Sequence, residues 1–459
     1  MDIVVKIAQF IVCLSLLIVV HELGHYLFSR LFKVRVEKFY LFFNPKFSIL
    51  RMKRINKKWR LSWFSKAVPE ERKEHPEKTE WGIGWLPLGG YCKIAGMIDE
   101  SMDTEQMKQE PKPWEFRTKP AGKRLPIMVG GVLFNVIFAM LIYGGILYKW
   151  GETYIANKDV TYGVASGPLG QAIGIENGDK IIAIDDEKVE DFGTITLQIV
   201  RNKASTITVE RNGEHLDLPI DADTRIKLRK APYGSFVSPR LFAKIGAFAD
   251  TSSAQLAGVR LDDAIIAING NPITFFDELR QNVSVNKGQN INMLVKRNDD
   301  TLSLTVPVPA NGVVGIYPQN SINITHISYG LLESIPKGAI KGIKSVRDYF
   351  KDLSIIFSPS EKAYSDVGGF IMIGSVFPST WDWHNFWSLC ALLSIMLAVI
   401  NILPIPALDG GHVFFLLYEV ITRRKPSDRF MEYAQLVGLL LIFALVIYAN
   451  GNDIIKLFN

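Results

Sequence analysis

Cysteine is scarce in this sequence, and so is excess charge of either sign. The 459 residues include only 3 cysteines, Cys13, Cys92 and Cys390, which lie far apart. They provide neither a disulfide framework nor a cysteine-rich zinc site. The formal net charge is +6, and the sequence shows no basic helix and no groove of alternating basic and aromatic residues. We therefore expect no nucleic-acid partner.

Charge is almost absent from four long apolar runs, although the mean hydropathy of the whole chain is only +0.14. A helix needs about 20 mostly apolar residues to cross a bilayer. The runs that meet this length are 7–32, 125–148, 386–408 and 433–450. The first could be a cleaved signal peptide, but no small-residue cleavage site follows its apolar core. We therefore expect four membrane-spanning helices, the first of them retained.

The distribution of positive charge predicts the orientation of these spans. The short loop between the last two runs contains Arg423, Arg424, Lys425 and Arg429, and the loop after the first run has a similar excess of Lys and Arg. Such loops stay on the cytoplasmic side. Four spans put both loops on one side, so the two signals agree. Both termini and the stretch 151–380 are then expected outside the cytoplasm.

That exported stretch contains an internal repeat. Gly174–Asp185 aligns with Gly258–Asn269 in the pattern G-[IV]-x-x-[GD]-D-x-I-x-x-I-[DN], and an alternating strand follows each copy. The order of turn, buried strand, helix and strand is typical of a small β/α domain. The pattern resembles tandem bacterial PDZ domains, except that Asp262 replaces the usual turn glycine in the second copy. Such domains can grip an extended chain by strand addition, or they can act only as a steric barrier.

The second half of the first apolar run contains His21-Glu22-Leu23-Gly24-His25. Residues four apart share one face of a helix, so His21 and His25 can bind one zinc ion. Glu22 is then placed to act on a water molecule as a general base. Three ionisable side chains inside an apolar helix are costly to insert into a membrane, which favours a metal site over a chance match.

A catalytic zinc ion needs a third protein ligand. The extended motif of soluble zinc proteases is absent, because Phe28 and Leu31 replace its later glycine and histidine. Asp409 is the predicted third ligand, since it follows a run broken by Pro404 and Pro406. A helix cap is the alternative role for Asp409. His412 is the rival ligand, and we expect it to fix the loop instead.

Together these features resemble the site-2 protease family of intramembrane zinc proteases. The family's marks are HExxH in the first core helix and N-x-x-P-x-P-x-L-D-G in a later one, and Asn401 begins the second motif here. The tandem PDZ-like repeat points to the RseP-like branch. The resemblance implies one zinc ion on His21, His25 and Asp409, with Glu22 activating water. It also implies that Asn401, Pro404 and Pro406 help to hold the substrate.

Weaker matches to the family suggest two further elements. Gly131-x-x-x-Asn135 resembles its GxxxN element and makes Asn135 a candidate substrate-binding residue, with plain helix packing as the alternative. The glycine-rich stretch 81–92 is the candidate for a membrane-associated β-hairpin whose edge could bind an unwound substrate. Phe43-Asn44-Pro45 and Met396 depart from the family pattern, which affects expected substrate preference and not the chemistry.

The predicted fold is a polytopic α-helical membrane protein with four transmembrane helices, a cytoplasmic-side β-hairpin and two inserted PDZ-like β/α domains. An amphipathic helical pattern from Tyr329 to Phe350 suggests a gating segment. The predicted divisions are 1–32 (first span), 33–121 (cytoplasmic loop), 122–150 (second span), 151–226 and 227–310 (PDZ-like domains), 311–383 (gating segment), 384–421 (third span) and 430–450 (fourth span).

The expected function follows from the family resemblance. The chain would be a zinc endoprotease of a bacterial cytoplasmic (inner) membrane. Its partners would be the lipid bilayer and single-span membrane proteins, such as an anti-sigma factor or a signal-peptide remnant, bound as an added strand after site-1 trimming. A metal-binding membrane transporter or sensor is one alternative, but it gives Glu22 no role. A membrane-anchored PDZ scaffold is another, but it leaves HELGH unexplained.

Overall fold

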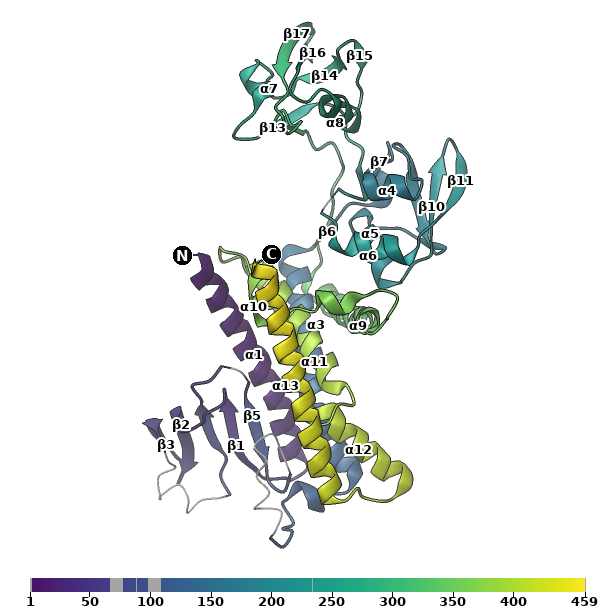
Figure 1. Cartoon of the computed structure of the whole chain (residues 1–459). Coiled ribbons are helices and arrows are strands. Elements are labelled where there is room, and N and C mark those ends of the chain that lie inside the picture. Colours follow the sequence, from purple (N-terminus) through teal and green to yellow (C-terminus); the bar gives the residue numbers. More distant parts are fainter. Residues whose placement is uncertain (1, 67–76, 88, 98–108, 233, 459) are drawn as a thin grey trace. The chain divides into compact units, whose positions relative to one another are not determined.

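The computed structural model describes residues 2–66, 77–87, 89–97, 109–232 and 234–458. By its internal contacts the chain divides into two compact units. The first contains the long helices and one β-sheet, and the second contains two β domains (Figure 1). The first unit comprises Met1–Gly151, Ser328–Ser354 and Tyr364–Asn459, and the second comprises Glu152–Ile327 and Ile355–Ala363.

Four helices of the first unit are long and apolar enough to cross a membrane. Each covers most of one predicted run, which confirms the number of candidate spans. α3 packs against both α1 and α11, and a fully buried apolar core that includes Cys13, Ala139 and Cys390 joins the three. The four helices are α1 (Asp2–Leu31), α3 (Ala121–Trp150), α11 (Trp383–Ile402) and α13 (Asp428–Phe458).

The third predicted segment, 384–421, is two helices and not one. α11 ends at Ile402, and a second helix, α12 (Asp409–Thr422), begins at the predicted ligand. Proline has no amide hydrogen and cannot continue a helix, so Pro404 and Pro406 separate the two. Ala407 in this break has a φ of 78°, a left-handed conformation that no residue within a right-handed helix adopts.

The loop expected over 33–121 forms a five-stranded sheet beside the lower part of α1 (Figure 1). The predicted hairpin over 81–92 is wrong. Its first strand, β4, pairs with β2 and β1 inside the sheet, while β5 pairs with the other side of β1. Leu88 of that stretch, and 67–76 and 98–108 of the loop, lie outside the described residues. The strand order is β3 (Lys58–Ser65), β2 (Ser48–Ile55), β4 (Glu80–Ile83), β1 (Val36–Leu41), β5 (Tyr91–Ile94).

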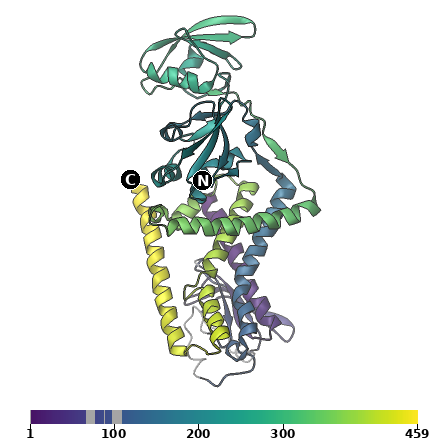
Figure 2. The same ribbon diagram turned by 90° about the vertical axis from the view of Figure 1, so that its right-hand side faces the viewer.

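The amphipathic pattern predicted from Tyr329 is a helix, α9 (Leu331–Ile356), that runs across the long helices (Figure 2). Glycine allows this crossing. A Cβ atom on Gly338 would lie 2.3 Å from the backbone nitrogen of Gly144 in α3, so the two helix backbones nearly touch. The short helix α10 (Phe370–Ser375) is held at its start by Asp453 of α13, which accepts hydrogen bonds from the Gly369 and Met372 amides.

Each β domain of the second unit has a four-stranded antiparallel sheet with the same order of strands. The first domain contains β7 (Val164–Ser166), α4 (Pro168–Ala172), β8 (Lys180–Ile184), β9 (Glu187–Lys188), α5 (Ile195–Arg201), β10 (Thr206–Arg211), β11 (Glu214–Pro219), α6 (Ala222–Lys230) and β12 (Val237–Pro239). The second contains β13 (Ile245–Phe248), α7 (Ser253–Leu256), β14 (Ala264–Ile268), β15 (Asn271–Pro272), α8 (Phe276–Val285), β16 (Asn290–Arg297), β17 (Asp300–Pro307) and β18 (Ile316–Pro318). β6 (Glu152–Tyr154) and β19 (Thr325–Ile327) pair beside them.

The predicted repeat has a physical basis in these domains. Asp179 and Asp263, the equivalent aspartates of the two copies, are both buried, and each is bound at 2.7 Å by an arginine from the following long strand, Arg211 or Arg297. Asp262, which replaces the turn glycine, has a φ of 66°. It therefore adopts the left-handed conformation that glycine usually supplies, and the turn is preserved.

Both predicted ends of the β domains fall too early. β12 pairs with β7, and β18 pairs with β13, so the domains continue past 226 and past 310. Buried apolar residues of these late segments, such as Phe236 and Ile316, belong to the two cores. Three-residue strands without a repeated motif give little sequence signal, which explains the error.

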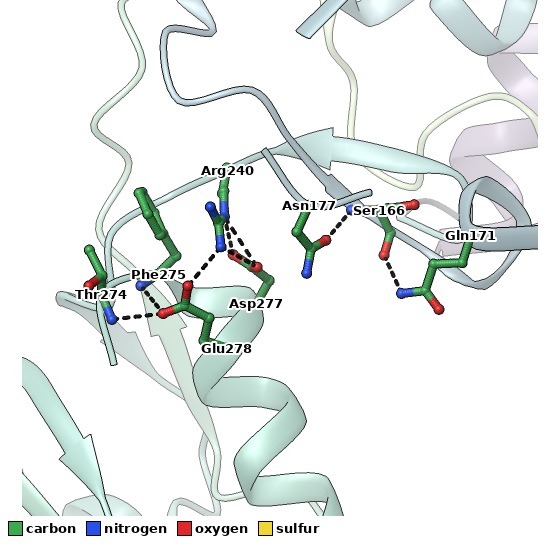
Figure 3. Close-up of polar contacts among 8 residues, drawn as sticks. All are labelled: Ser166, Gln171, Asn177, Arg240, Thr274, Phe275, Asp277 and Glu278. Atoms are coloured by element: carbon green, nitrogen blue, oxygen red, sulfur yellow. Dashed lines mark hydrogen bonds and ion pairs between the residues drawn. The ribbon is translucent and has the colours of Figure 1, made fainter. Parts of the chain in front are cut away.

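Arg240 joins the two β domains (Figure 3). Its backbone amide donates to the Gly163 carbonyl of the first domain at 3.0 Å. Its guanidinium binds Asp277 and Glu278 at the start of α8 in the second domain and lies 3.9 Å from the centre of the Phe275 ring. One residue thus contacts both domains through separate groups.

Candidate metal centre

The two histidines of the HELGH motif lie one turn apart on the same face of α1. Both are buried, with 8% of His21 and 6% of His25 exposed, and their Nε2 atoms are 3.2 Å apart. Asp409, at the first residue of α12, directs Oδ2 between them, 3.1 Å from His21 Nε2 and 3.3 Å from His25 Nε2. The fold therefore brings together the three ligands that were predicted from positions far apart in the sequence.

The three ligand atoms fit a zinc ion. Two ligands at the zinc–nitrogen distance of 2.0–2.1 Å with tetrahedral angles are about 3.3 Å from each other, close to all three separations here. Asp409 Oδ2 is buried and makes no hydrogen bond within the described part of the chain. No other cluster of three His, Cys, Asp or Glu side chains of this kind is found among the described residues. Two imidazoles and one carboxylate are a common zinc donor set.

Contacts on the far side of each imidazole fix its orientation. His25 Nδ1 lies 2.9 Å from the backbone carbonyl of Ile127 in α3, so it donates its hydrogen there and leaves the Nε2 lone pair for a metal. His21 Nδ1 lies 3.2 Å from the Asn135 amide. The two ends of an amide group are assigned from their bonding partners. Asn135 Oδ1 is buried and has no bond among the described residues, and placing it on the His21 Nδ1 hydrogen satisfies both groups.

The GxxxN element in α3 is explained by this arrangement. A Cβ atom on Gly131 would lie 2.5 Å from His25 Nε2 and 2.6 Å from His21 Cε1, so only glycine leaves space for the imidazoles. Asn135 is one helical turn further along and is fully buried against His21. Gly24 of α1 also lies against the Gly130 carbonyl. The GxxxN element therefore combines close helix packing at Gly131 with the placement of the Asn135 side chain against His21.

The break between α11 and α12 positions Asp409. Glycines allow the chain to fold back tightly, since a Cβ atom on Gly410 would lie 2.1 Å from the Leu403 carbonyl oxygen. Gly438 of α13 packs in the same way against the carbonyl of Pro406. The prolines thus shape the loop that carries Asp409. Asn401, in the last turn of α11, places its amide nitrogen 3.4 Å from His21 Nε2, at the edge of the cluster.

Glu22 and His412 differ in their relation to the cluster. Glu22 interacts electrostatically with both histidines and with Asp409, and its carboxylate accepts a backbone hydrogen bond from Cys92 in β5. β5 therefore borders the site. His412 instead places Nε2 3.0 Å from the Gln435 side chain of α13 and is not part of the cluster.

Two backbone contacts of the candidate site could not be predicted from the sequence. The Ile127 carbonyl and the Cys92 amide are backbone groups, so no residue type could signal them. Only the positions of α3 and β5 beside α1 reveal their roles.

Comparison with known proteins agrees with this geometry. A model of Peptidase family M50 matches residues 9–65 and 68–445. The chain is 28% identical to "Regulator of sigma-E protease RseP" of Escherichia coli over 480 residues, covering 98% of each chain. It is 25% identical to "Regulator of sigma E protease" of Haemophilus influenzae over 474 residues, covering 98% of this chain and 99% of that protein.

A third relative, from Vibrio cholerae, has a name that describes a zinc metalloprotease. It is 25% identical over 486 residues, covering 99% of this chain and all of the relative. The family match spans most of the chain and includes both halves of the metal cluster. The chain therefore belongs to Peptidase family M50 and is an RseP-like membrane metalloprotease of the site-2 type.

Proposed function

We propose that this protein binds one zinc ion through His21, His25 and Asp409 and cleaves peptide bonds within transmembrane segments of single-span membrane proteins. The supporting observation is the convergence of three ligand atoms within 3.1–3.3 Å, next to Glu22 and between helices apolar enough to span a membrane. A zinc ion bound there supplies a Lewis acid for the scissile carbonyl and makes water nucleophilic near neutral pH.

Glu22 is the proposed general base. Its carboxylate would take the proton of the attacking water and pass it to the leaving nitrogen. The Cys92 amide holds this side chain beside the cluster. Asn135 would keep His21 in the tautomer that leaves Nε2 without a hydrogen, as the Ile127 carbonyl does for His25. Such outer contacts typically change metal affinity 10–100-fold when removed.

β5 is the proposed binding strand for the substrate. It is the last strand of the sheet in the described part of the chain, with β1 on one side, and it contacts α1. A transmembrane helix has all its backbone groups bonded internally and must unwind before it can be cleaved. Adding the unwound segment to β5 would replace those bonds next to Glu22. Asn401 is placed to contact it.

The remaining proposals concern access. We place both termini and the two PDZ-like domains outside the cytoplasm of a bacterial inner membrane, since Lys and Arg concentrate in the two loops on the opposite side. The PDZ-like domains would exclude substrates with large ectodomains, so prior trimming would be required. α9 would control the entry of substrates to the metal centre. By analogy with relatives named as regulators of sigma E, the substrates would include anti-sigma factors.

The decisive experiment compares wild type with Glu22→Gln. Both proteins are purified, their zinc content is measured, and each is incubated with a panel of model transmembrane substrates. Equal zinc with cleavage by wild type alone is expected. Glu432→Gln, which changes an exposed carboxylate of α13, is the matched control and should cleave normally. Equal cleavage by Glu22→Gln, or none by wild type on any substrate, would contradict the proposal.

A further inference from the structure

A hollow of about 470 Å³ lies against the side of α3 and α11, toward the ends of these helices that are distant from the metal ligands. Its volume is within the range of small-molecule binding sites. The walls are apolar side chains of both helices, including Leu141 and Trp387, together with Gly145. Lys149, in the last turn of α3, is the one charged residue among the lining side chains.

Tryptophans mark the level at which this hollow opens. Trp150 and Trp383 line it, the ring of Trp150 packs edge-on against His384 at 5.3 Å, and Trp381 packs against Trp383 at 5.4 Å. Tryptophan concentrates where the hydrocarbon of a bilayer meets the headgroups. The opening is therefore at headgroup level, while Leu141, more than two turns before Trp150, lies at the depth of the acyl chains.

The one charge among the side chains that line this hollow is the positive charge of Lys149. The Lys149 ammonium lies 5.2 Å from the centre of the Trp150 ring, and within the described residues no ion pair involves it. The carboxylates nearest in sequence to the lining residues are Glu152 and Asp382, and neither lines the hollow. Asp382 caps α11 by accepting a hydrogen bond from the Asn385 amide at 2.7 Å. An apolar hollow beneath a basic residue matches a ligand with an acyl chain and an anionic head, and basic pockets between transmembrane helices bind such lipids.

We propose that this hollow binds one anionic phospholipid, with an acyl chain against Leu141 and Gly145 and the headgroup phosphate on Lys149. The site is separate from the metal centre, so its occupancy and peptide hydrolysis can be measured independently. Bound lipid would pack against α3 and α11, the two helices that carry Asn135 and Asn401.

Two variants test the apolar and the charged parts of the site. Gly145→Leu fills the hollow, and no atom lies within 4 Å of a Cβ atom built at Gly145, so the helix should tolerate it. Gly122→Leu, at the other end of α3 and equally open, is its control. Lys149→Gln removes the charge, and Lys456→Gln, in the last turn of α13, is the control.

The full-length proteins are mixed with equal amounts of phosphatidylglycerol and phosphatidylcholine, and retained lipids are counted by native mass spectrometry. Wild type and both controls should retain one phosphatidylglycerol in preference to phosphatidylcholine. Gly145→Leu should lose it. Lys149→Gln should lower the preference about fivefold, because one basic residue near an anionic lipid contributes about 1 kcal/mol.

Three results would overturn the proposal. One is equal retention of phosphatidylglycerol by wild type and Gly145→Leu. Another is no headgroup preference in wild type, as expected of lipid that merely surrounds the protein. The third is displacement of the lipid by a model transmembrane substrate, which would make the hollow a substrate contact.

Discussion

Buried carboxylate oxygens occur in both units of this protein, but those of Asp179 and Asp263 have different surroundings from that of Asp409. In the β domains Asp179 and Asp263 each receive two hydrogen bonds from one arginine and further bonds from the backbone. In the helical unit Asp409 faces two imidazoles, and its Oδ2 makes no hydrogen bond among the described residues. Satisfied buried charges stabilise a fold, whereas an unsatisfied buried carboxylate oxygen is costly and fits the role of a metal ligand.

The largest expected difference between the two kinds of carboxylate is in zinc binding. Asp409→Ala removes a proposed direct ligand, so zinc affinity should fall by more than the roughly 10–100-fold that is typical of losing an outer partner. Titration with a competing chelator measures this. Asp263→Ala is the control and should retain wild-type affinity. Wild-type zinc affinity in Asp409→Ala would show that Asp409 is not a ligand.

Asn135 tests the outer contacts of the same cluster. Asn135→Ala should weaken zinc binding about 10–100-fold, because His21 would lose the group that holds its tautomer. Ser394→Ala, which removes a hydrogen bond to the Asn135 backbone only, should bind zinc normally. If Asn135→Ala binds zinc normally but has a raised KM, then Asn135 contacts substrate, as the sequence resemblance implied.

Asp263→Asn tests the role of a buried carboxylate whose oxygens are hydrogen-bonded. Losing a charged hydrogen-bond partner should destabilise the second β domain by about 1.5–3 kcal/mol without changing zinc binding. Hydrogen exchange of β14 and β16 amides in the full-length protein measures the effect. Similar protection in variant and wild type at pH 7 would contradict the structural role of this ion pair.

The destabilisation caused by Asp263→Asn should disappear in acid. Burial alone would raise the pKa of Asp263, but the bonds from Arg297 and from the Arg260 amide lower it overall. The stabilisation is therefore complete above the unfolded-state pKa of about 3.9 and is lost as the pH falls through the lower folded-state value. The difference between wild type and Asp263→Asn should shrink below about pH 4.

The smallest expected effect is a cross-link between two uncharged cysteine side chains of the helical unit. Cys13 and Cys390 are fully buried, and their Sγ atoms are 2.9 Å apart. Copper phenanthroline should oxidise them to a disulfide that links α1 to α11 with little movement. After proteolysis between Glu152 and Ile327, the two fragments should stay together on a non-reducing gel. The fragments of Cys92→Ser should stay together as in wild type, whereas the fragments of Cys390→Ser should separate.

The sequence was most informative where a residue type is costly to bury or where a motif occurs twice. Ionisable residues are rare inside apolar helices, so His21, His25 and Asp409 could be selected without a structure. The buried aspartates of the two β domains could be aligned because the same turn and ion pair occur twice. The prolines likewise predicted a helix break. The helix that follows it, anticipated in the alternative role of Asp409 as a cap, begins at Asp409 itself, with Leu408 as its N-cap.

Prediction was weaker where pairing partners are distant in the chain. The stretch 81–92 has the glycines and aromatics of a hairpin, but β4 and β5 both pair with β1 instead of with each other. Strand pairing depends on contacts between distant residues that local patterns do not encode. The ends of the β domains were missed for the same reason, since β12 and β18 return to pair with strands at the start of each domain.

The sequence by itself determined the four apolar helices, the duplicated domain and the three candidate metal ligands, because these depend on local composition and spacing. Only the tertiary structure decided that the ligand atoms converge, that Gly131 leaves space for both imidazoles, and that Asn135, Ile127 and Cys92 surround the cluster. These contacts join α1, α3, α12 and β5, and glycine allows the backbones to approach that closely. Such proximity arises from the packing of elements that are distant in the sequence, so it cannot be predicted from any one segment.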